Sequence, residues 1–319
     1  MKPFLMSLGA SLLFVATFTQ AGHYPVTITS CQRDVRFERA PQRAVSQDVN
    51  LTGMLLALGL RPNMAGYSGI SGWKTLDEDF RAQLTGLPEL APRYPSVENL
   101  LNAGADLFFA GWNYGMHVGG EVTPATLAPL GIPVYELTES CAHVMPRDAA
   151  RLEDLYADLL NLGRIFDVEP RADALVSDLR GRVERVRQSV PKDARAPGVF
   201  LYDSGEDRPF TAGRLAMPQA LIEAAGGRNL MDDLASSWSR VNWETVVERD
   251  PEVILIVDYG VVSAEQKREF LLSHPALQQV RAIREKRFVV LPYLQVTPSV
   301  DNVTAIETLA AALHPGLRP

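Results

Sequence analysis

The side chains best suited to chemistry in this sequence are aromatic and ionisable residues that follow buried, apolar segments. They lie in short stretches rich in glycine, serine and aspartate, such as residues 66–74, 110–117, 201–210 and 257–260. Open α/β sheets bind ligands in the crevice at the carboxyl ends of their strands, so a ligand site is expected at these stretches. We therefore predict a binding site that draws on ten residues: Tyr67, Trp73, Trp112, Tyr114, Tyr202, Arg208, Trp238, Arg240, Tyr259 and Tyr293.

The residue types in this set indicate the kind of ligand. Aromatic rings present large rigid faces at little entropic cost, which suits a flat or bulky organic molecule. The guanidinium groups of Arg208, Arg214 and Arg240 are suited to pairing with an anionic ligand. The acidic cluster in residues 203–207 argues against a strongly anionic ligand, such as a catecholate complex would be. The sequence leaves open whether the site takes an anionic or a neutral complex.

Motifs for catalysis or for metal binding do not occur in the sequence. There is no HExxH motif, no histidine-rich cluster and no GxSxG motif. Residues 203–205 (DSG) are typical of a turn, and Gly226-Gly227 is typical of a helix C-cap. Direct zinc or manganese binding through His117 is a minor alternative. We expect a binding protein with no catalytic residues, no metal ligands and no resident cofactor. The alternative is an exported enzyme with the α/β fold described below.

Predicted strands and helices alternate in both halves of the chain, a pattern that favours parallel sheets covered by helices. In the first half, a hairpin is predicted over 23–37, and strands are predicted at 44–46, 64–67 and 133–137, with a helix followed by a buried strand in 95–112. In the second half, strands are predicted at 199–202, 253–257 and 287–291, and a terminal helix at 303–313.

A helical stretch from Arg147 to Val190 separates the two halves. Its apolar residues recur at the three- and four-residue steps of an amphipathic helix. Pro170 fits the first turn of a helix, so two helices are expected to meet at 167–169. We predict an N-terminal α/β lobe (22–168), a connecting backbone helix (169–190) and a C-terminal α/β lobe (191–319). Pattern alone leaves open a helical hairpin inside one larger α/β domain.

The first residues indicate export. Lys2 is followed by an apolar run over 4–18 and by Thr19-Gln20-Ala21, an acceptable cleavage site, so residues 1–21 are predicted to be a signal peptide. The apolar run is short for a membrane anchor, and no lipobox cysteine follows it. We expect a periplasmic protein that is not inserted in the membrane. The net charge of −7 and the absence of a basic block argue against nucleic acid and anionic membranes as partners.

The sequence contains two cysteines, Cys31 and Cys141. In an oxidising compartment, two cysteines suggest one disulfide, which here would tie the first predicted strand to the segment after the last strand of the first lobe. Two free buried thiols are the alternative.

Segments along nearly the whole mature chain match one known family in their order. In the first half they are APQRAV with LLALGLRPNMAGY, SVENLLNAGADLFFA, LGIPVYEL and LLNLGRIFDVEPRADALVSDL; in the second half, FTAG, LIEAAGGRNLM, VNWETVVERDPEVILIV and DNVTAIETLAAAL. This series resembles the periplasmic solute-binding proteins of ABC importers that carry ferric siderophores, haem and cobalamin. The resemblance implies two Rossmann-like lobes with mostly parallel sheets, joined by one rigid backbone helix, with a ligand held between them and little opening.

The resemblance also implies a membrane partner, an ABC importer permease dimer with its ATPase. In this family one acidic residue per lobe, at an exposed helix start, docks onto permease arginines. The matching positions are Glu98 in PSVENLL and Glu244 in VNWETVV. Ser96 and Asn242 are suitable N-caps, which would place each glutamate in a first turn favoured by the helix dipole. A purely helix-stabilising role for the glutamates is the alternative.

From this resemblance we expect a monomer that captures a ferric siderophore and delivers it to the permease. A cobalamin or corrinoid cargo is the alternative, followed by haem or a free metal ion.

Overall fold

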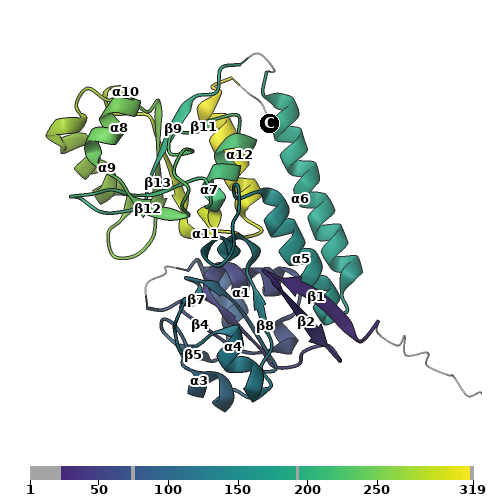
Figure 1. Cartoon of the computed structure of the whole chain (residues 1–319). Helices are drawn as coiled ribbons and strands as arrows, with labels where there is room; N and C mark the ends of the chain where they lie inside the picture. Colours follow the sequence, from purple (N-terminus) through teal and green to yellow (C-terminus); the bar gives the residue numbers. More distant parts are fainter. Residues whose placement is uncertain (1–22, 73–75, 192–193, 317–319) are drawn as a thin grey trace, which may run out of the picture.

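The computed structural model describes residues 23–72, 76–191 and 194–316. Two α/β lobes lie one above the other in Figure 1, and helices α5 (Leu152–Phe166) and α6 (Glu169–Ser189) run along one side of both lobes. The predicted signal peptide lies outside the described residues. Within the described part of the chain, no helix is both long and apolar enough to cross a membrane.

The N-terminal lobe contains a parallel sheet in the order β5-β4-β3-β6, with β7 and β8 both pairing with β6. Its strands are β3 (Ala44–Gln47), β4 (Met64–Ser68), β5 (Glu89–Ala91), β6 (Leu107–Trp112), β7 (Gly115–Met116) and β8 (Val134–Glu136). Its helices are α1 (Asp48–Ala57), α2 (Glu78–Leu84), α3 (Val97–Asn102) and α4 (Pro124–Leu127), with 3-10 helices η1 (Arg61–Asn63), η2 (Ala128–Leu130) and η3 (Thr138–His143). The predicted antiparallel hairpin is confirmed as β1 (Val26–Ser30) and β2 (Arg33–Phe37).

The C-terminal lobe contains a parallel sheet in the order β11-β9-β13-β14, beside a short antiparallel pair, β10-β12. The strands are β9 (Gly198–Tyr202), β10 (Phe210–Ala212), β11 (Arg228–Asn229), β12 (Trp238–Arg240), β13 (Val253–Asp258) and β14 (Phe288–Pro292). The helices are α7 (Met217–Ala224), α8 (Trp243–Arg249), α9 (Ala264–Ser273), α10 (Arg281–Arg284), α11 (Tyr293–Val296) and α12 (Asn302–Leu313), with the 3-10 helix η4 (Pro275–Leu277). The predicted fold class, two lobes with parallel Rossmann-like sheets flanked by helices, is confirmed.

The helical stretch begins later than predicted. Helix α5 starts at Leu152 rather than at Arg147, because the preceding residues are committed to other contacts. The Arg147 guanidinium pairs with Asp154 at 2.5 Å and donates to the Thr138 carbonyl oxygen, while the Arg151 amide donates to Asp154. As predicted, Pro170 lies in the first turn of α6.

One apolar core extends through both lobes. Alternate residues of each sheet face it, for example Leu107 and Phe109 of β6 in one lobe and Leu201 of β9 in the other, together with the buried faces of α5, α6 and α12. Residues of opposite parity face separate outer cores, as Phe108 and Phe200 do. The two lobes therefore have separate sheets but share their largest core.

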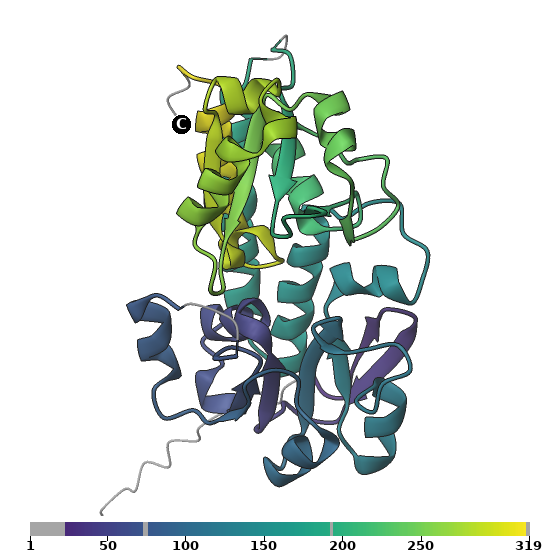
Figure 2. The ribbon, with the colours of Figure 1, turned by 90° about the vertical axis from the view of Figure 1, so that its left-hand side faces the viewer.

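Helix α6 is fastened to both lobes. Near its start, Arg171 donates to the Leu58 carbonyl oxygen at the end of α1. Further along, the Arg182 guanidinium makes two hydrogen bonds to the Glu307 carboxylate of α12, at 2.7 and 3.0 Å. Figure 2 shows α5 and α6 passing behind both lobes. This arrangement fixes the distance between the sheets on that side of the molecule.

Candidate functional site

A cavity of about 360 Å³ lies between the two lobes, and both lobes line it. We call it the aromatic cavity, because six of its twelve lining residues are Tyr, Phe or Trp. The N-terminal lobe contributes Asp48, Tyr94, Asn113, Tyr114 and His143, and the C-terminal lobe contributes Asp203, Phe210, Ser237, Trp238, Tyr259, Tyr293 and Thr297.

The parallel strands position this cavity. Asp48 directly follows β3, Asp203 follows β9, Tyr259 follows β13 and Tyr293 follows β14. Because the carboxyl ends of parallel strands lie at one edge of a sheet, these side chains gather where the two sheet edges face each other. The cavity is therefore at the position predicted for a ligand site of this fold.

Carboxylates hold two of the cavity tyrosines. The Tyr293 hydroxyl donates to Asp48 at 3.0 Å, a contact that joins the two lobes. The Tyr259 hydroxyl donates to Asp203 at 2.8 Å. Behind this ring, the buried Lys267 ammonium lies 4.7 Å from the Tyr259 ring centre. These contacts fix two aromatic faces, so the cavity wall is pre-organised for a rigid ligand.

Two lining residues adopt left-handed backbone conformations. Asp48 has φ 66° and Asn113 has φ 65°. Such conformations cost energy in non-glycine residues and concentrate at binding sites. Each residue makes contacts at the cavity: Asp48 accepts from the tyrosine opposite, and the Asn113 carbonyl oxygen accepts from Tyr94 at 2.6 Å.

The N-terminal wall is uncharged where Tyr94, Asn113 and His143 form it. The Asn113 amide lies 3.3 Å from His143 Nε2. Burial lowers the pKa of His143 and raises the pKa of Tyr94 to about 12. At neutral pH these side chains therefore offer neutral hydrogen-bonding groups.

Four of the ten predicted ligand residues line the aromatic cavity: Tyr114, Trp238, Tyr259 and Tyr293. Tyr202 does not, because it shares the parity of Phe200 and points into the outer core. Its ring centre lies 5.6 Å from that of Trp243 and 6.2 Å from that of Phe270.

Arg208 and Arg240, the two arginines among the ten predicted ligand residues, are exposed and do not line the cavity. Arg240 lies with its guanidinium carbon 5.6 Å from the centre of the Phe210 ring and donates to the Arg208 carbonyl oxygen. Their expected role as ion-pair partners for a ligand in this cavity therefore finds no geometric support. Tyr67 is half-buried beside Val49 and Phe80, outside the lining of the cavity. Trp73 lies outside the described residues.

Trp112 lines a separate cavity of about 400 Å³ within the N-terminal lobe. Its indole nitrogen donates to Glu136 at 2.9 Å. The predicted disulfide between Cys31 and Cys141 is confirmed at the same cavity, with a Cα–Cα distance of 5.4 Å. The disulfide links the β1-β2 turn to η3. The last residue of η3 is His143, which lines the aromatic cavity.

Eight lining residues were absent from the predicted set: Asp48, Tyr94, Asn113, His143, Asp203, Phe210, Ser237 and Thr297. Asp48, Asn113 and Asp203 each directly follow a strand, and this position is the signal by which a sequence could reveal them. Phe210, Ser237 and Thr297 carry no such signal, because they reach the cavity through the β10-β12 pair and the loop after α11.

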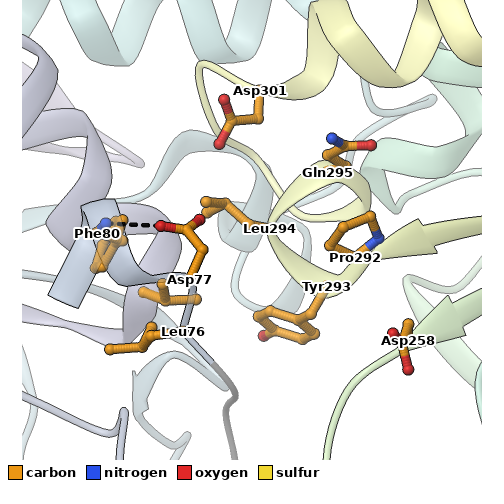
Figure 3. Close-up of a pocket in the computed structure, with 10 residues that line it drawn as sticks. Leu76, Asp77, Phe80, Asp258, Pro292, Tyr293, Leu294, Gln295 and Asp301 are labelled. Carbon is orange, nitrogen blue, oxygen red and sulfur yellow. Dashed lines mark hydrogen bonds between the residues drawn. The ribbon is translucent and has the colours of Figure 1, made fainter. Parts of the chain in front are cut away.

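A second cavity of about 340 Å³ also lies between the lobes, and Tyr293 lines both cavities. Figure 3 shows Asp77 and Asp301 approaching it from opposite lobes, with Asp77 accepting from the Phe80 amide at 2.7 Å as the cap of α2. Burial, followed by the Asp77 charge, raises the pKa of Asp301. Among the described residues, no group of three or more His, Cys, Asp or Glu side chains is placed to hold a metal ion.

The two predicted docking glutamates occupy exposed first turns of helices in different lobes. Glu98 lies in α3, where Ser96 and Asn99 form a capping box. Glu244 lies in α8, where the Asn242 side chain makes no cap hydrogen bond. In Figure 1, α3 lies at the bottom of the N-terminal lobe and α8 on the left of the C-terminal lobe.

Comparison with known proteins identifies relatives of the same architecture. The family model "Periplasmic binding protein" matches residues 45–293. A cobalamin-binding protein of Halobacterium salinarum is 25% identical over 240 residues, which are 74% of this chain and 59% of that protein. A vitamin B12-binding protein of Pectobacterium carotovorum is 24% identical over 217 residues, which are 68% of this chain and 71% of that protein.

Solved structures agree. A periplasmic binding protein from Veillonella parvula superposes with a TM-score of 0.79 at 27% identity, covering 91% of this chain and 97% of that one. An ABC-type Fe3+-hydroxamate transport protein from Saccharomonospora viridis gives a TM-score of 0.75 at 24% identity, covering 91% and 99%. The family match, the two sheets with their shared core and the cavity between them lead to the same conclusion: the chain belongs to the periplasmic binding protein family.

Proposed function

We propose that this protein captures a metal chelate in the aromatic cavity and delivers it to the permease of an ABC importer in the periplasm. The observation that carries the proposal is the aromatic cavity itself, which lies at the strand ends of both lobes and is walled by rings held in fixed positions. Its relatives are binding proteins, which supports a binding function rather than catalysis.

A corrinoid is the first candidate cargo. Six aromatic side chains suit a ligand with broad, flat faces. Curated relatives that cover most of the chain bind cobalamin or vitamin B12, according to their names. The family resemblance favours a ferric siderophore over a corrinoid, with three arginines suited to an anionic ligand, but Arg208 and Arg240 do not line the cavity.

A neutral ferric hydroxamate is the second candidate. Tyr94, Asn113 and His143 offer hydrogen-bonding groups without charge, which suit its carbonyl and hydroxamate oxygens.

Intrinsic tryptophan fluorescence tests the cargo class. The purified protein is titrated with cyanocobalamin, cobinamide, a ferric trihydroxamate, a ferric catecholate, haemin and free metal ions, with N-acetyltryptophanamide as the control for light absorption by coloured ligands. Saturable quenching by a corrinoid is expected if the first candidate cargo is right, and saturable quenching by the ferric trihydroxamate if the second is right. A response to the catecholate alone, to bare metal alone, or to no ligand would contradict the proposal.

We further propose that Glu98 and Glu244 dock the protein onto arginines of the permease. Exposed charges at the rim of an interface mainly speed encounter and fix register. The double variant Glu98→Ala/Glu244→Ala should lose ligand uptake in reconstituted transporter and keep ligand binding. Glu78→Ala/Glu248→Ala is the matched control, because these are exposed helix glutamates in the same two lobes. Equal uptake by both double variants would rule out the docking role.

A further inference from the structure

A carboxyl group outside the aromatic cavity joins its wall to the opposite lobe. Glu139 belongs to η3 of the N-terminal lobe and is 2% exposed. Its Oε1 accepts from the amide of Met217, the first residue of α7 in the C-terminal lobe, at 2.7 Å. Its Oε2 lies 3.4 Å from the hydroxyl of Tyr114, which lines the cavity. Glu139 therefore lies between a cavity ring and a helix of the other lobe.

Neighbouring contacts show that the lobes meet closely here. Arg214, just before α7, donates to the Asp148 carbonyl oxygen at 2.9 Å and accepts from the Ala150 amide at 2.9 Å. The disulfide holds the same 3-10 helix through Cys141. The segment around Glu139 is thus fixed to both lobes. A substitution of Glu139 removes its contacts with Tyr114 on one side and with the first residue of α7 on the other.

We propose that Glu139 is a positioning residue for ligand binding, which sets the place of Tyr114 relative to α7 across the boundary between the lobes. This inference rests on the proposed use of the aromatic cavity as the ligand site. Glu139 does not line that cavity, so its effect on affinity acts through Tyr114 and through the spacing of the lobes.

Burial and, to a lesser extent, the Asp154 carboxylate raise the pKa of Glu139, while the Met217 amide, Tyr114 and Arg147 lower it; the resulting pKa is about 8. Arg147 is itself paired with Asp154. At neutral pH Glu139 is therefore mostly protonated, with Oε1 accepting from the Met217 amide and Oε2 within reach of the Tyr114 hydroxyl. Ionisation would leave a charge on this buried side chain, which favours separation of the lobes.

Other ionisable groups face the same segment and must be separated from Glu139 in a test. His143, on η3 itself, has a lowered pKa, and Tyr114 has a raised one, so neither titrates near pH 8. Asp158 of α5 bonds Thr138, next to Glu139, and its pKa is raised to about 7. Glu139→Gln separates these contributions, because it removes only one titration and keeps an acceptor and a donor.

The binding arm measures the affinity for cyanocobalamin by calorimetry between about pH 7 and about pH 9. If only the protonated form is competent, wild-type affinity should fall roughly tenfold over this range, in proportion to the competent fraction. Glu139→Gln should show little of this fall, and Glu139→Ala should bind more weakly at every pH. Equal pH profiles in wild type and Glu139→Gln would overturn the inference.

The ligand-free arm keeps the two proposals separate. Spin labels on Glu78→Cys and Glu248→Cys report the distance between the lobes by pulsed electron resonance. The distance distribution should be narrow near pH 6 and broader near pH 9 in wild type, narrow at both in Glu139→Gln, and broad at both in Glu139→Ala. If the protein does not bind cyanocobalamin, the corrinoid proposal fails while this arm still decides the role of Glu139. Equally narrow distributions in all three proteins would contradict that role.

Discussion

The two sides of the boundary between the lobes are built in different ways. On one side, which we call the back, α5, α6 and α12 lie together (to the right in Figure 1), and one apolar core continues from the first sheet to the second. On the front, the lobes meet through single polar contacts, such as Tyr293 with Asp48 and Met217 with Glu139, around the aromatic cavity. We call these regions the back seam and the front seam.

The difference separates stability from function. Apolar burial on the back contributes free energy in proportion to area and leaves little freedom to change the spacing of the sheets. Polar contacts on the front each contribute little net stability, but they fix the positions of rings and carboxylates that a ligand meets. We therefore expect substitutions in the back seam to change unfolding, and those in the front seam to change binding.

The largest effect on folding is expected for Leu179→Ala in α6. Leu179 is 2% exposed in the back seam, and removing a buried leucine costs about 2–5 kcal/mol of unfolding free energy. The matched control is Leu101→Ala in α3, where the leucine is 47% exposed and the cost should stay below about 1 kcal/mol. Denaturant unfolding measures both. Similar losses in the two variants would show that the back seam carries no special share of stability.

Loss of the disulfide should rank second. Cys31→Ser/Cys141→Ser opens a loop with a sequence separation of 110 residues, and the expected cost is about 2–4 kcal/mol. Because the bridge anchors η3, which bears Glu139 and His143, the variant should also bind ligand more weakly. When wild-type protein is denatured without reduction and treated with a thiol reagent, labelling should be near zero, because both cysteines are in the disulfide. Unchanged unfolding in the double variant would refute the structural role.

A pH effect on stability is expected from Asp158 in α5. Its carboxylate accepts from Tyr135 at 2.8 Å and from Thr138 at 2.6 Å, and burial raises its pKa to about 7 from 3.8. The folded state therefore holds a proton that the unfolded state has lost, so this group lowers stability as pH rises from about 4 to about 7, by at most about 1.4 kcal/mol per pH unit.

Asp158→Asn should remove that part of the pH dependence and leave ligand affinity unchanged, in contrast to Glu139 of the front seam. Asp173→Asn, an exposed aspartate of α6, is the control. Urea unfolding across this pH range compares the three proteins. If the unfolding free energy of Asp158→Asn depended on pH as that of the wild type does, the titrating group would be a residue other than Asp158.

The smallest effect on stability is expected at the two docking glutamates. Glu98 and Glu244 are exposed and touch neither seam, so changing both to Ala should shift the unfolding free energy by less than about 1 kcal/mol. Thermal unfolding measures this shift. A larger loss would favour the helix-stabilising role that the sequence also allowed.

The sequence predicted the lobes, the first hairpin and the disulfide, because these follow from local periodicity and from cysteine chemistry. It predicted the cavity less well, since strand parity decides which side chains reach it. Tyr202 ends β9 and points with Phe200 into the outer core, whereas Asp203, one residue later, lines the cavity. That distinction needs the register of the sheet and the position of the helices that cover it.

Other cavity residues depend on contacts between distant segments. Asp48 is the first residue of α1, and only the approach of Tyr293 from the opposite lobe shows its role at the cavity. Arg240 looks like a ligand residue, but it lies exposed against Phe210. Such long-range pairings leave no trace in spacing or composition.

A pair of tryptophans tests the central claim that the aromatic cavity is the ligand site. Trp238 lines that cavity, whereas Trp112 lines the cavity beside the disulfide, and both are half-buried. Calorimetric titration of Trp238→Ala and Trp112→Ala with cyanocobalamin compares them directly. The account predicts that Trp238→Ala loses roughly tenfold or more in affinity, about 1.4 kcal/mol, while Trp112→Ala binds like wild type. Loss of affinity in Trp112→Ala with unchanged binding in Trp238→Ala would contradict it.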